Sequence, residues 1–300
     1  LSLCETRAEM EMEVPDDSVF DCVERVLMPK WRSYLGAVSA WFCGRPLQIG
    51  YYRSRKFRQL AGAMASRHDG ILSHLIRVGD VAKDIEGLPN FLEMTDAISM
   101  NYRRVIALDK TKKSFREYVY ALEADRLERY ERSCLHQFDL VTLVSEVDRD
   151  FLTDGGDHAN VIVSSNGVDC AGLPFTHRDP KGRTAVFIGN QTSAQNLDAC
   201  FHFAENILPA LNRRFGLNFL VVGKCRDADA VRLSALPNVK VLGRVESIPE
   251  SVADGWIGVC PVRIGAGVQN KVLEYMALGL PVISSSLGCE GFEARSGVDI

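Results

Sequence analysis

Short apolar runs alternate with helical patterns through the C-terminal half of the chain. The runs are rich in β-branched and aromatic residues, as buried strands are. They lie at 185–188, 218–222, 240–242, 256–260 and 281–284. Residues 194–213 carry apolar side chains at helical spacing, and shorter helices are expected near 227–235 and 247–253. This alternation predicts a parallel sheet with helices on both of its faces.

The N-terminal half has the same kind of pattern with less regularity. Strand-like runs occur at 70–76, 90–94 and 139–144, and residues 112–136 form a long amphipathic pattern. Together with the C-terminal half, this predicts an α/β protein with two parallel-sheet domains.

Turn-forming residues separate the two halves. Glycine and proline recur between 165 and 183, directly after a short apolar run at 161–163. We therefore expect an N-terminal domain over 1–168, a linker over 169–183 and a C-terminal domain over 184–300.

Turns at the ends of several predicted C-terminal strands favour a shared ligand site. Ligands of open parallel sheets bind outside the carboxyl ends of the strands. Gly265 and Gly267 lie where we expect a helix to begin, so backbone N–H groups and the helix dipole there favour an anion. Lys271 and Glu274 follow on one helical stripe. The candidate ligand-binding residues are Gly189, Asn190, Arg244, Arg263, Gly265, Ala266, Gly267, Val268, Lys271 and Glu274.

The same helix should turn a separate apolar stripe toward the core. Val268, Val272 and Met276 are spaced by four residues and are expected to form it. The combination suits a nucleoside diphosphate with its ribose, because the loop favours a phosphate and is followed by a lysine and a carboxylate. A solvated Lys–Glu pair on a helix surface has the same spacing and is the alternative.

The bulk composition narrows the class of protein. The chain has 300 residues, 46% of them hydrophobic, and a net charge of −4, which argues against a nucleic-acid partner. No apolar run of membrane-spanning length is present. Nine cysteines without a Cys-x-x-Cys pair fit reduced thiols in a cytoplasm.

One stretch departs from this acidic balance. Residues 25–68 contain nine Lys or Arg residues and no Asp or Glu, with aromatic residues interleaved. An anionic membrane surface is one expected partner, and a solvated basic face over an aromatic core is the alternative. Under the first interpretation the docking cluster is Arg53, Arg55, Lys56 and Arg58.

The glycine loop and the helix after it resemble a known signature. The shared residues are Gly265, Gly267, Lys271, Glu274, Ala277, Gly279, Pro281, Val282 and the run Gly288-Cys-Glu-Gly291. This resembles glycosyltransferases of group 1 (GT4) with the GT-B fold, in which two Rossmann-like domains flank a cleft. The resemblance implies a retaining sugar transfer from a UDP- or GDP-sugar, with no cofactor and no obligatory metal, and with Glu274 on the ribose. Ala266 departs from relatives that carry a glutamate there.

Pieces of the N-terminal half resemble one branch of that family, found in bacterial exopolysaccharide (PEP-CTERM-associated) gene clusters. They include Asp96-Ala-Ile-Ser99 and Val144-Ser-Glu-x-Asp148. The branch implies a lipid-linked or polysaccharide acceptor and an enzyme that is cytoplasmic, peripheral on the inner face of the plasma membrane. Compared with the family, we expect a first strand and helix before Leu1, and helices after Ile300, to be missing.

The N-terminal half offers two candidate catalytic residues beside Lys271. Asp96 and His74 both come at the end of a predicted strand, and a carboxylate there can polarise an acceptor hydroxyl. Asp227-Ala-Asp229 imitates a metal motif but is expected to cap a helix, and Lys110–Lys113 is expected to be solvated.

Two other functions remain open at this point. A nucleotide-sugar epimerase can use the same scaffold, because a fold does not settle a function. A non-catalytic nucleotide-sugar-binding partner in glycan assembly is the second alternative.

Overall fold

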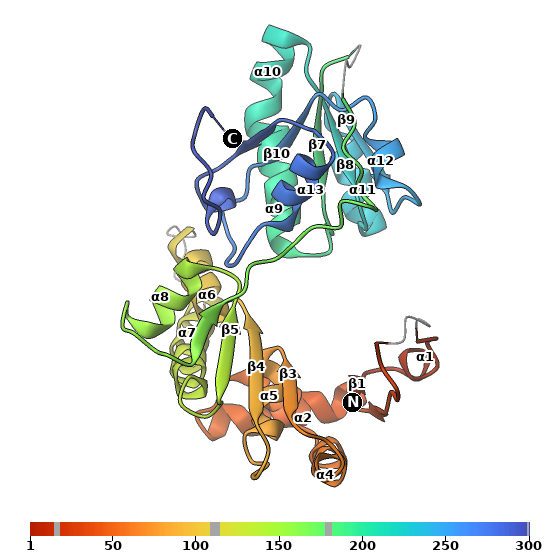
Figure 1. The fold of residues 1–300 in the computed structure, drawn as a ribbon. Coiled ribbons are helices and arrows are strands. Elements are labelled where there is room, and N and C mark those ends of the chain that lie inside the picture. Colours follow the sequence, from red (N-terminus) through yellow and green to blue (C-terminus); the bar gives the residue numbers. More distant parts are fainter. Residues whose placement is uncertain (15–18, 109–114, 178–181, 299) are drawn as a thin grey trace. The chain divides into compact units, whose positions relative to one another are not determined.

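The computed structural model describes residues 1–14, 19–108, 115–177, 182–298 and 300. The chain divides into two compact units, Leu1–Ser164 and Ser165–Ile300 (Figure 1). Residues 110–113, expected to be solvated, lie outside the described ranges, as does the beginning of the helix expected over 112–136.

The N-terminal unit is built on a parallel sheet of four strands. Their order is β3 (Ile71–His74), β4 (Asn90–Thr95), β5 (Leu140–Leu143) and β6 (Val161–Val163). Two further strands, β1 (Ser2–Cys4) and β2 (Arg25–Leu27), pair in parallel with each other. The helices are α1 (Arg7–Met10), α2 (Lys30–Phe42), α3 (Leu47–Tyr51), α4 (Arg55–Ala65), α5 (Ile76–Ala82), α6 (Ile98–Leu108), α7 (Phe115–Cys134) and α8 (Glu146–Thr153).

The core of this unit lies where α5 packs against β4. In β4, every second residue is buried, with Leu92 and Met94 fully so. Gly79 of α5 lies against Leu92 and Phe138, where a methyl group would be within 3.4 Å of both side chains. Helix α5 can therefore approach the sheet closely, directly after the carboxyl end of β3.

A pocket of about 730 Å³ lies in the N-terminal unit between the two groups of strands. Residues 1–3 and residues 70–75 both line it, so β1 and β3 share its walls. Phe57 and Met64 of α4 add apolar surface, and His74 and Glu93 add polar surface.

The C-terminal unit holds a parallel sheet of five strands (Figure 1). Their order is β11 (Val282–Ser284), β10 (Ile257–Cys260), β7 (Thr184–Ile188), β8 (Asn218–Val222) and β9 (Val239–Gly243). The helices are α9 (Ala194–His202), a π-helical turn η1 (Phe203–Ile207), α10 (Leu208–Phe215), α11 (Asp227–Ser234), α12 (Ile248–Ser251), α13 (Asn270–Ala277) and the 3₁₀ turn η2 (Leu287–Cys289).

The chain order makes β7 the point where this sheet reverses direction. From β7 the chain builds β8 and β9 on one side, then crosses back to place β10 and β11 on the other. A reversal of this kind leaves a crevice at the carboxyl ends of the two central strands, which is where open α/β sheets bind ligands. Here those strands are β7 and β10.

Candidate functional site

The crevice is held open by one buried tyrosine. β7 and β10 pair only through Ile257 with Ala185 and Gly258 with Val186. Beyond that point the hydroxyl of Tyr275 lies between them, accepting from the N–H of Ile188 at 2.9 Å and donating to the carbonyl of Val259 at 3.1 Å. The tyrosine replaces the next ladder bonds, so the strands part at their carboxyl ends.

Gly258 makes room for this tyrosine. A Cβ at Gly258 would lie 2.4 Å from Cγ of the Tyr275 ring, which any side chain would have to displace. Tyr275 itself is fully buried, and burial raises its pKa well above the ordinary value. Its hydroxyl therefore stays neutral and serves both strands as a hydrogen-bonding bridge.

The loop after β7 forms one wall of the site. The Asn190 side chain accepts from Thr192 N–H at 3.1 Å and from Thr192 Oγ1 at 2.7 Å, closing a tight turn. Asn196 of α9 donates to the Asn190 carbonyl at 3.0 Å. Sequence interpretation placed Gly189 and Asn190 here as ligand groups, and the structure shows that the Asn190 side chain also holds the loop.

Gln191 is a polar group that the sequence did not single out as a site residue. Its side chain is fully buried, and neither its amide oxygen nor its amide nitrogen has a hydrogen-bond partner among the described residues. A buried amide left without partners costs about 1–3 kcal/mol, so it favours a polar ligand that would satisfy it. It lies next to Gly223, whose added Cβ would be 3.4 Å from the amide oxygen.

The loop after β10 forms the opposite wall. Gly265 has φ 149° and Gly267 has φ 68°, which are conformations that other residues rarely adopt. An added Cβ at Gly265 would be 3.3 Å from both Gln195 and Gln269, so only glycine fits comfortably between these amides. Ala266 and Val268 are half-buried in the same loop.

Helix α13 begins at Asn270, later than the two glycines suggested. The expectation that the helix starts at Gly265–Gly267 is therefore wrong, because the loop continues through Gln269. The Asn270 side chain accepts from Asn166 at 2.7 Å, so the Asn166-Gly-Val-Asp169 segment reaches the start of this helix. The later start changes which residues of the helix are buried.

Lys271 is buried at the beginning of α13. Only 7% of it is exposed, and its ammonium donates to the Gln269 amide oxygen at 2.8 Å. It also lies over the Phe187 ring, 5.5 Å from the centroid. Burial lowers the pKa of Lys271, while the neighbouring Cys260 and Glu274 raise it. A desolvated cation with a neutral partner is suited to an anionic ligand.

Glu274 follows one turn later and is half-buried. Burial raises the pKa of its carboxyl group, and Lys271 opposes that shift. The predicted apolar stripe is only partly right: Val272 is fully buried, but Met276 is 48% exposed. Tyr275 and Leu278 occupy the core instead, because the helix register is set by the tyrosine between the strands.

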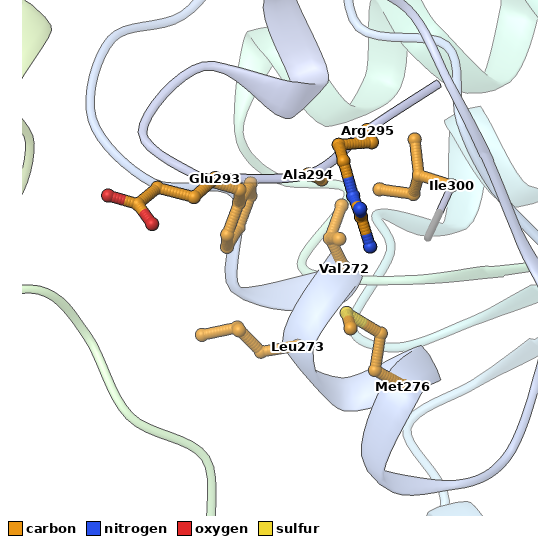
Figure 2. A pocket seen from close by; sticks show the side chains of 8 residues that line it. Val272, Leu273, Met276, Glu293, Ala294, Arg295 and Ile300 are labelled. Atoms are coloured by element: carbon orange, nitrogen blue, oxygen red, sulfur yellow. The ribbon is translucent and has the colours of Figure 1, made fainter. Parts of the chain in front are cut away.

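The exposed side of α13 lines a different pocket, of about 900 Å³. Figure 2 shows Leu273 and Met276 on the helix, with Glu293 pointing away from them. None of the residues that line it is Lys271, Glu274 or a glycine of the loop. This pocket is larger than the pocket of the N-terminal unit, but it is not the candidate site, because the buried Lys271 and Gln191 do not line it.

Of the two arginines expected at the site, one is ion-paired and the other is exposed after β9. Arg263 pairs with Asp198 of α9, with N–O distances of 3.1 and 2.5 Å. Asp198 therefore links the helix after β7 to the loop after β10. Arg244 is exposed after β9, which β8 separates from β7. Asp227 and Asp229 lie in the first turn of α11, but the N-cap residue is Arg226 and no side chain caps the helix, so the expected capping is wrong.

The N-terminal unit gathers its candidate groups at the carboxyl ends of β3 and β4. His74 Nδ1 lies 2.5 Å from Glu93 Oε2, and both side chains are solvent-accessible. The residues beside the candidates, Leu75 and Thr95, have positive φ values of 69° and 71°. Such conformations cost about 1–3 kcal/mol in non-glycine residues and concentrate at functional sites.

Asp96 follows Thr95 and joins a group of carboxyls. Burial raises its pKa to about 6, with a further contribution from Asp148 and opposition from Arg77. Burial also raises the pKa of Glu131 to about 8, although hydrogen bonds from Ser99 oppose the shift. This unit therefore places a carboxyl able to exchange a proton near neutral pH at the end of a strand.

The described residues of both units can be compared with the requirements of a membrane span and of a metal centre. Among the residues that the structure describes, no helix combines the length and apolarity needed to cross a bilayer. In the same ranges, no three acidic, histidine or cysteine side chains gather where a metal ion could bind.

One family model matches the C-terminal unit of the chain. Residues 182–298 match the model of the family described as glycosyl transferases group 1. No curated protein matches the chain by sequence. The match and the fold confirm the resemblance to group 1 glycosyltransferases of the GT-B fold.

Solved structures share the fold at low sequence identity. HepE from Anabaena, solved with UDP and glucose, aligns with TM-score 0.52 and 14% identity over 78% of this chain and 63% of its own. TarM of S. aureus, solved with UDP among other ligands, has TM-score 0.50 and 13% identity over 68% and 38%. Trehalose 6-phosphate synthase from Burkholderia multivorans has TM-score 0.55 and 13% identity over 88% and 71%. The chain therefore spans less than two thirds of HepE and TarM.

Proposed function

We propose that the protein transfers a sugar from a nucleoside diphosphate sugar to a hydroxyl group of a glycan acceptor. The observation that carries this proposal is the buried Lys271 beside the loop of Gly265 and Gly267, at the crevice between β7 and β10. A cation held in a desolvated site with only a neutral partner supports a ligand that brings its own negative charge.

Lys271 would stabilise the diphosphate as the leaving group. Negative charge grows on that group while the glycosidic bond breaks, and a fixed cation is most effective against charge that develops in the transition state. Gln191 offers an unpartnered amide for a phosphate oxygen or a sugar hydroxyl. Because Arg263 is paired with Asp198, Lys271 carries most of the positive charge in this proposal.

Glu274 would hold the ribose through its two hydroxyls. We favour a UDP-sugar over a GDP-sugar as the donor, because HepE and TarM were solved with UDP. We further propose a retaining reaction without a metal ion, in keeping with the family resemblance and with the use of Lys271 as the fixed cation.

Asp96 and His74 would act on the acceptor. A carboxyl whose pKa lies at about 6 can accept a proton from a hydroxyl near neutral pH and release it again. His74, hydrogen-bonded to Glu93, is the second candidate for this task. A lipid-linked acceptor from exopolysaccharide synthesis, handled at the cytoplasmic face of the membrane, is the acceptor class that we propose.

The test begins with binding. Titration of UDP, GDP and dTDP into the chain should give the largest thermal stabilisation with UDP. Activity with a UDP-sugar and a polyprenyl-linked acceptor, in the presence of EDTA, then tests the metal-independent transfer, and NMR of the product gives the configuration of the new bond.

Other outcomes would point to the alternatives. Release of an epimerised nucleotide sugar without any acceptor would identify an epimerase. Tight UDP binding with neither transfer nor hydrolysis would identify a binding-only partner, and no binding of any nucleotide would reject the proposed site.

A further inference from the structure

Helix α2 exposes its largest apolar side chains to solvent. Five residues of its thirteen are large, apolar and more than half exposed, and Phe42 reaches 83%. They are Trp31, Tyr34, Leu35, Val38 and Phe42. Their spacing of three, one, three and four residues places them within an arc of about 100° on one face of the helix.

The opposite face of α2 is made of small residues. Ser33 and Ala40 are buried, and Gly36 meets Gly50 of α3 so closely that an added Cβ would be 2.2 Å from the Gly50 carbonyl oxygen. A surface helix of a globular protein normally turns its large apolar residues toward the core. In α2 the small residues fill that role, so the large ones remain available to something outside the chain.

Positive charges border the apolar face. Lys30 and Arg32 lie on its two sides at the beginning of the helix, since each is displaced by about 100° from Trp31. The Lys30 ammonium lies 3.6 Å from the Glu5 carboxylate, but 61% of the lysine side chain is exposed. The Arg32 guanidinium lies 5.1 Å from the centroid of the Trp31 ring. Arg45 is exposed just beyond the end of the helix. Residues 25–68 contain no acidic side chain, although the whole chain carries a net charge of −4.

We propose that α2 docks the protein on an anionic membrane surface, lying in the interface with its five apolar residues among the acyl chains. The bordering cations would then meet lipid phosphates at the headgroup level. A second copy of the chain is a poorer occupant, because a self-complementary contact across α2 would bring Arg32 and Arg45 toward their own copies, and among the described residues only Lys30 of these cations has an acidic neighbour, Glu5 at 3.6 Å. Charge complementarity therefore selects the lipid.

This surface differs from the cluster expected from the sequence. Arg58 pairs with Asp80 and Asp84, and Arg53 lies 3.7 Å from Asp80, so two of the four expected cations already have acidic partners. Their role in holding α4 to α5 is structural. The membrane surface that we propose is centred on α2 instead of Arg53–Arg58.

The test is co-sedimentation of the 300-residue chain with vesicles of equal parts phosphatidylglycerol and phosphatidylcholine. Leu35→Ser with Phe42→Ser should lower the partition coefficient by about tenfold or more, because two buried apolar side chains are lost. Lys30→Ser with Arg32→Ser should lower it by about tenfold, and raised salt should remove that difference. Both pairs are exposed, so folding, followed by circular dichroism, should be unaffected.

A matched control removes equally exposed apolar residues elsewhere. Tyr118→Ser with Val231→Ser, on α7 and α11, should leave vesicle binding unchanged. The proposal is overturned if the wild-type chain does not bind, if it binds pure phosphatidylcholine equally well, or if the control pair matters as much as the α2 pair. Self-association abolished by the α2 pair, without vesicle binding, would assign the face to a second copy and overturn the lipid.

Discussion

The two units place opposite chemistry at the same position of the same kind of sheet. At the carboxyl ends of β3 and β4, the N-terminal unit gathers carboxyl groups, including Asp96 and Glu131. At the carboxyl ends of β7 and β10, the C-terminal unit gathers one amine, Lys271, and neutral amides such as Gln191. Burial acts on both sets, raising the pKa of the acids and lowering that of the lysine.

This difference between buried acids and a buried amine shows how each unit accommodates its buried polar groups. In the N-terminal unit, protonation can neutralise a carboxyl group and hydrogen bonds from Ser99 satisfy it. In the C-terminal unit, Lys271 has one neutral partner and Gln191 has none among the described residues. The Glu131 carboxyl is therefore satisfied within the chain, whereas the C-terminal site gains most from a charged ligand. The following predictions test that contrast.

The largest effect is expected from Lys271→Met. We expect turnover to fall by roughly 10²–10³-fold, because the substitution removes the fixed positive charge beside the developing leaving-group charge. The free energy of unfolding should stay constant or rise, since a desolvated ammonium is replaced by an apolar group of similar length. Steady-state kinetics and urea unfolding measure the two quantities.

Two further variants complete this experiment. Lys271→Arg should restore only part of the turnover, because a planar guanidinium does not fit the place of a compact ammonium. Lys240→Met, at an exposed position of β9, should change neither quantity. A normal turnover number in Lys271→Met would remove this residue from the mechanism.

Glu274→Ala should weaken binding of UDP by roughly 1.5–3 kcal/mol, which corresponds to about 10- to 150-fold in Kd. The reason is the loss of a carboxylate that can accept hydrogen bonds from both ribose hydroxyls. Calorimetric titration measures the affinity, and Glu293→Ala, an exposed change near the same helix, is the control. Equal affinities of Glu274→Ala and the wild type would show an ordinary surface pair with Lys271.

The stability of the N-terminal unit should depend on pH, because its buried titratable groups are acids. The pKa of Glu131 is raised in the folded chain from its ordinary value of 4.5 to about 8. The folded state therefore holds a proton that the unfolded state has lost, and stability should fall as the pH rises from about 4.5 through about 8. Asp96, with a pKa of about 6, should add to the same slope.

Glu131→Gln imitates the protonated acid and should flatten this slope. We expect the variant to be more stable than the wild type by roughly 4 kcal/mol near pH 8 and by less than about 1 kcal/mol near pH 5. Urea unfolding across this range, monitored by a probe in the N-terminal unit, measures the effect. Asp125→Asn on the same helix, an exposed position, is the control, and an unchanged slope in Glu131→Gln would assign the pH dependence to other groups.

The smallest effect is expected from Arg263→Gln. Because the arginine is paired with Asp198 and 43% of its side chain is exposed, its removal should change the Kd for UDP by less than about threefold. A much larger loss would show that Arg263 leaves Asp198 for the diphosphate, and Lys271 would then share the charge of the site. Asp198→Asn would sharpen that result by freeing the arginine.

Much of the C-terminal site follows from local sequence. Turn residues after apolar runs locate the strand ends, and the glycine loop with Lys271 and Glu274 locates the wall beside β10. The pairing of Arg263 with Asp198 was missed because the two residues are 65 positions apart. Gln191 was missed as a site residue because an amide after Gly189-Asn190 has the pattern of a solvated turn, and only the packing buries it.

The N-terminal unit was harder for a physical reason. Its short strands β1 and β2 and its helices α2 and α3 depend on contacts between elements, such as Gly36 against Gly50, that no periodicity encodes. In α2 the apolar stripe is strong, but it indicates the exposed side instead of the core. A pattern rule that assigns large apolar residues to the interior therefore gives the wrong face.

The bridge made by Tyr275 turns one backbone amide into a reporter. The N–H of Ile188 is bonded to a side chain of α13 and not to a neighbouring strand. Its exchange with deuterated water should therefore follow the undocking of α13, while the amides of Val186 and Phe187 follow the opening of the sheet. Slower exchange at Ile188 on adding UDP, without change at the other two, would show that ligand binding and the position of this helix are one equilibrium.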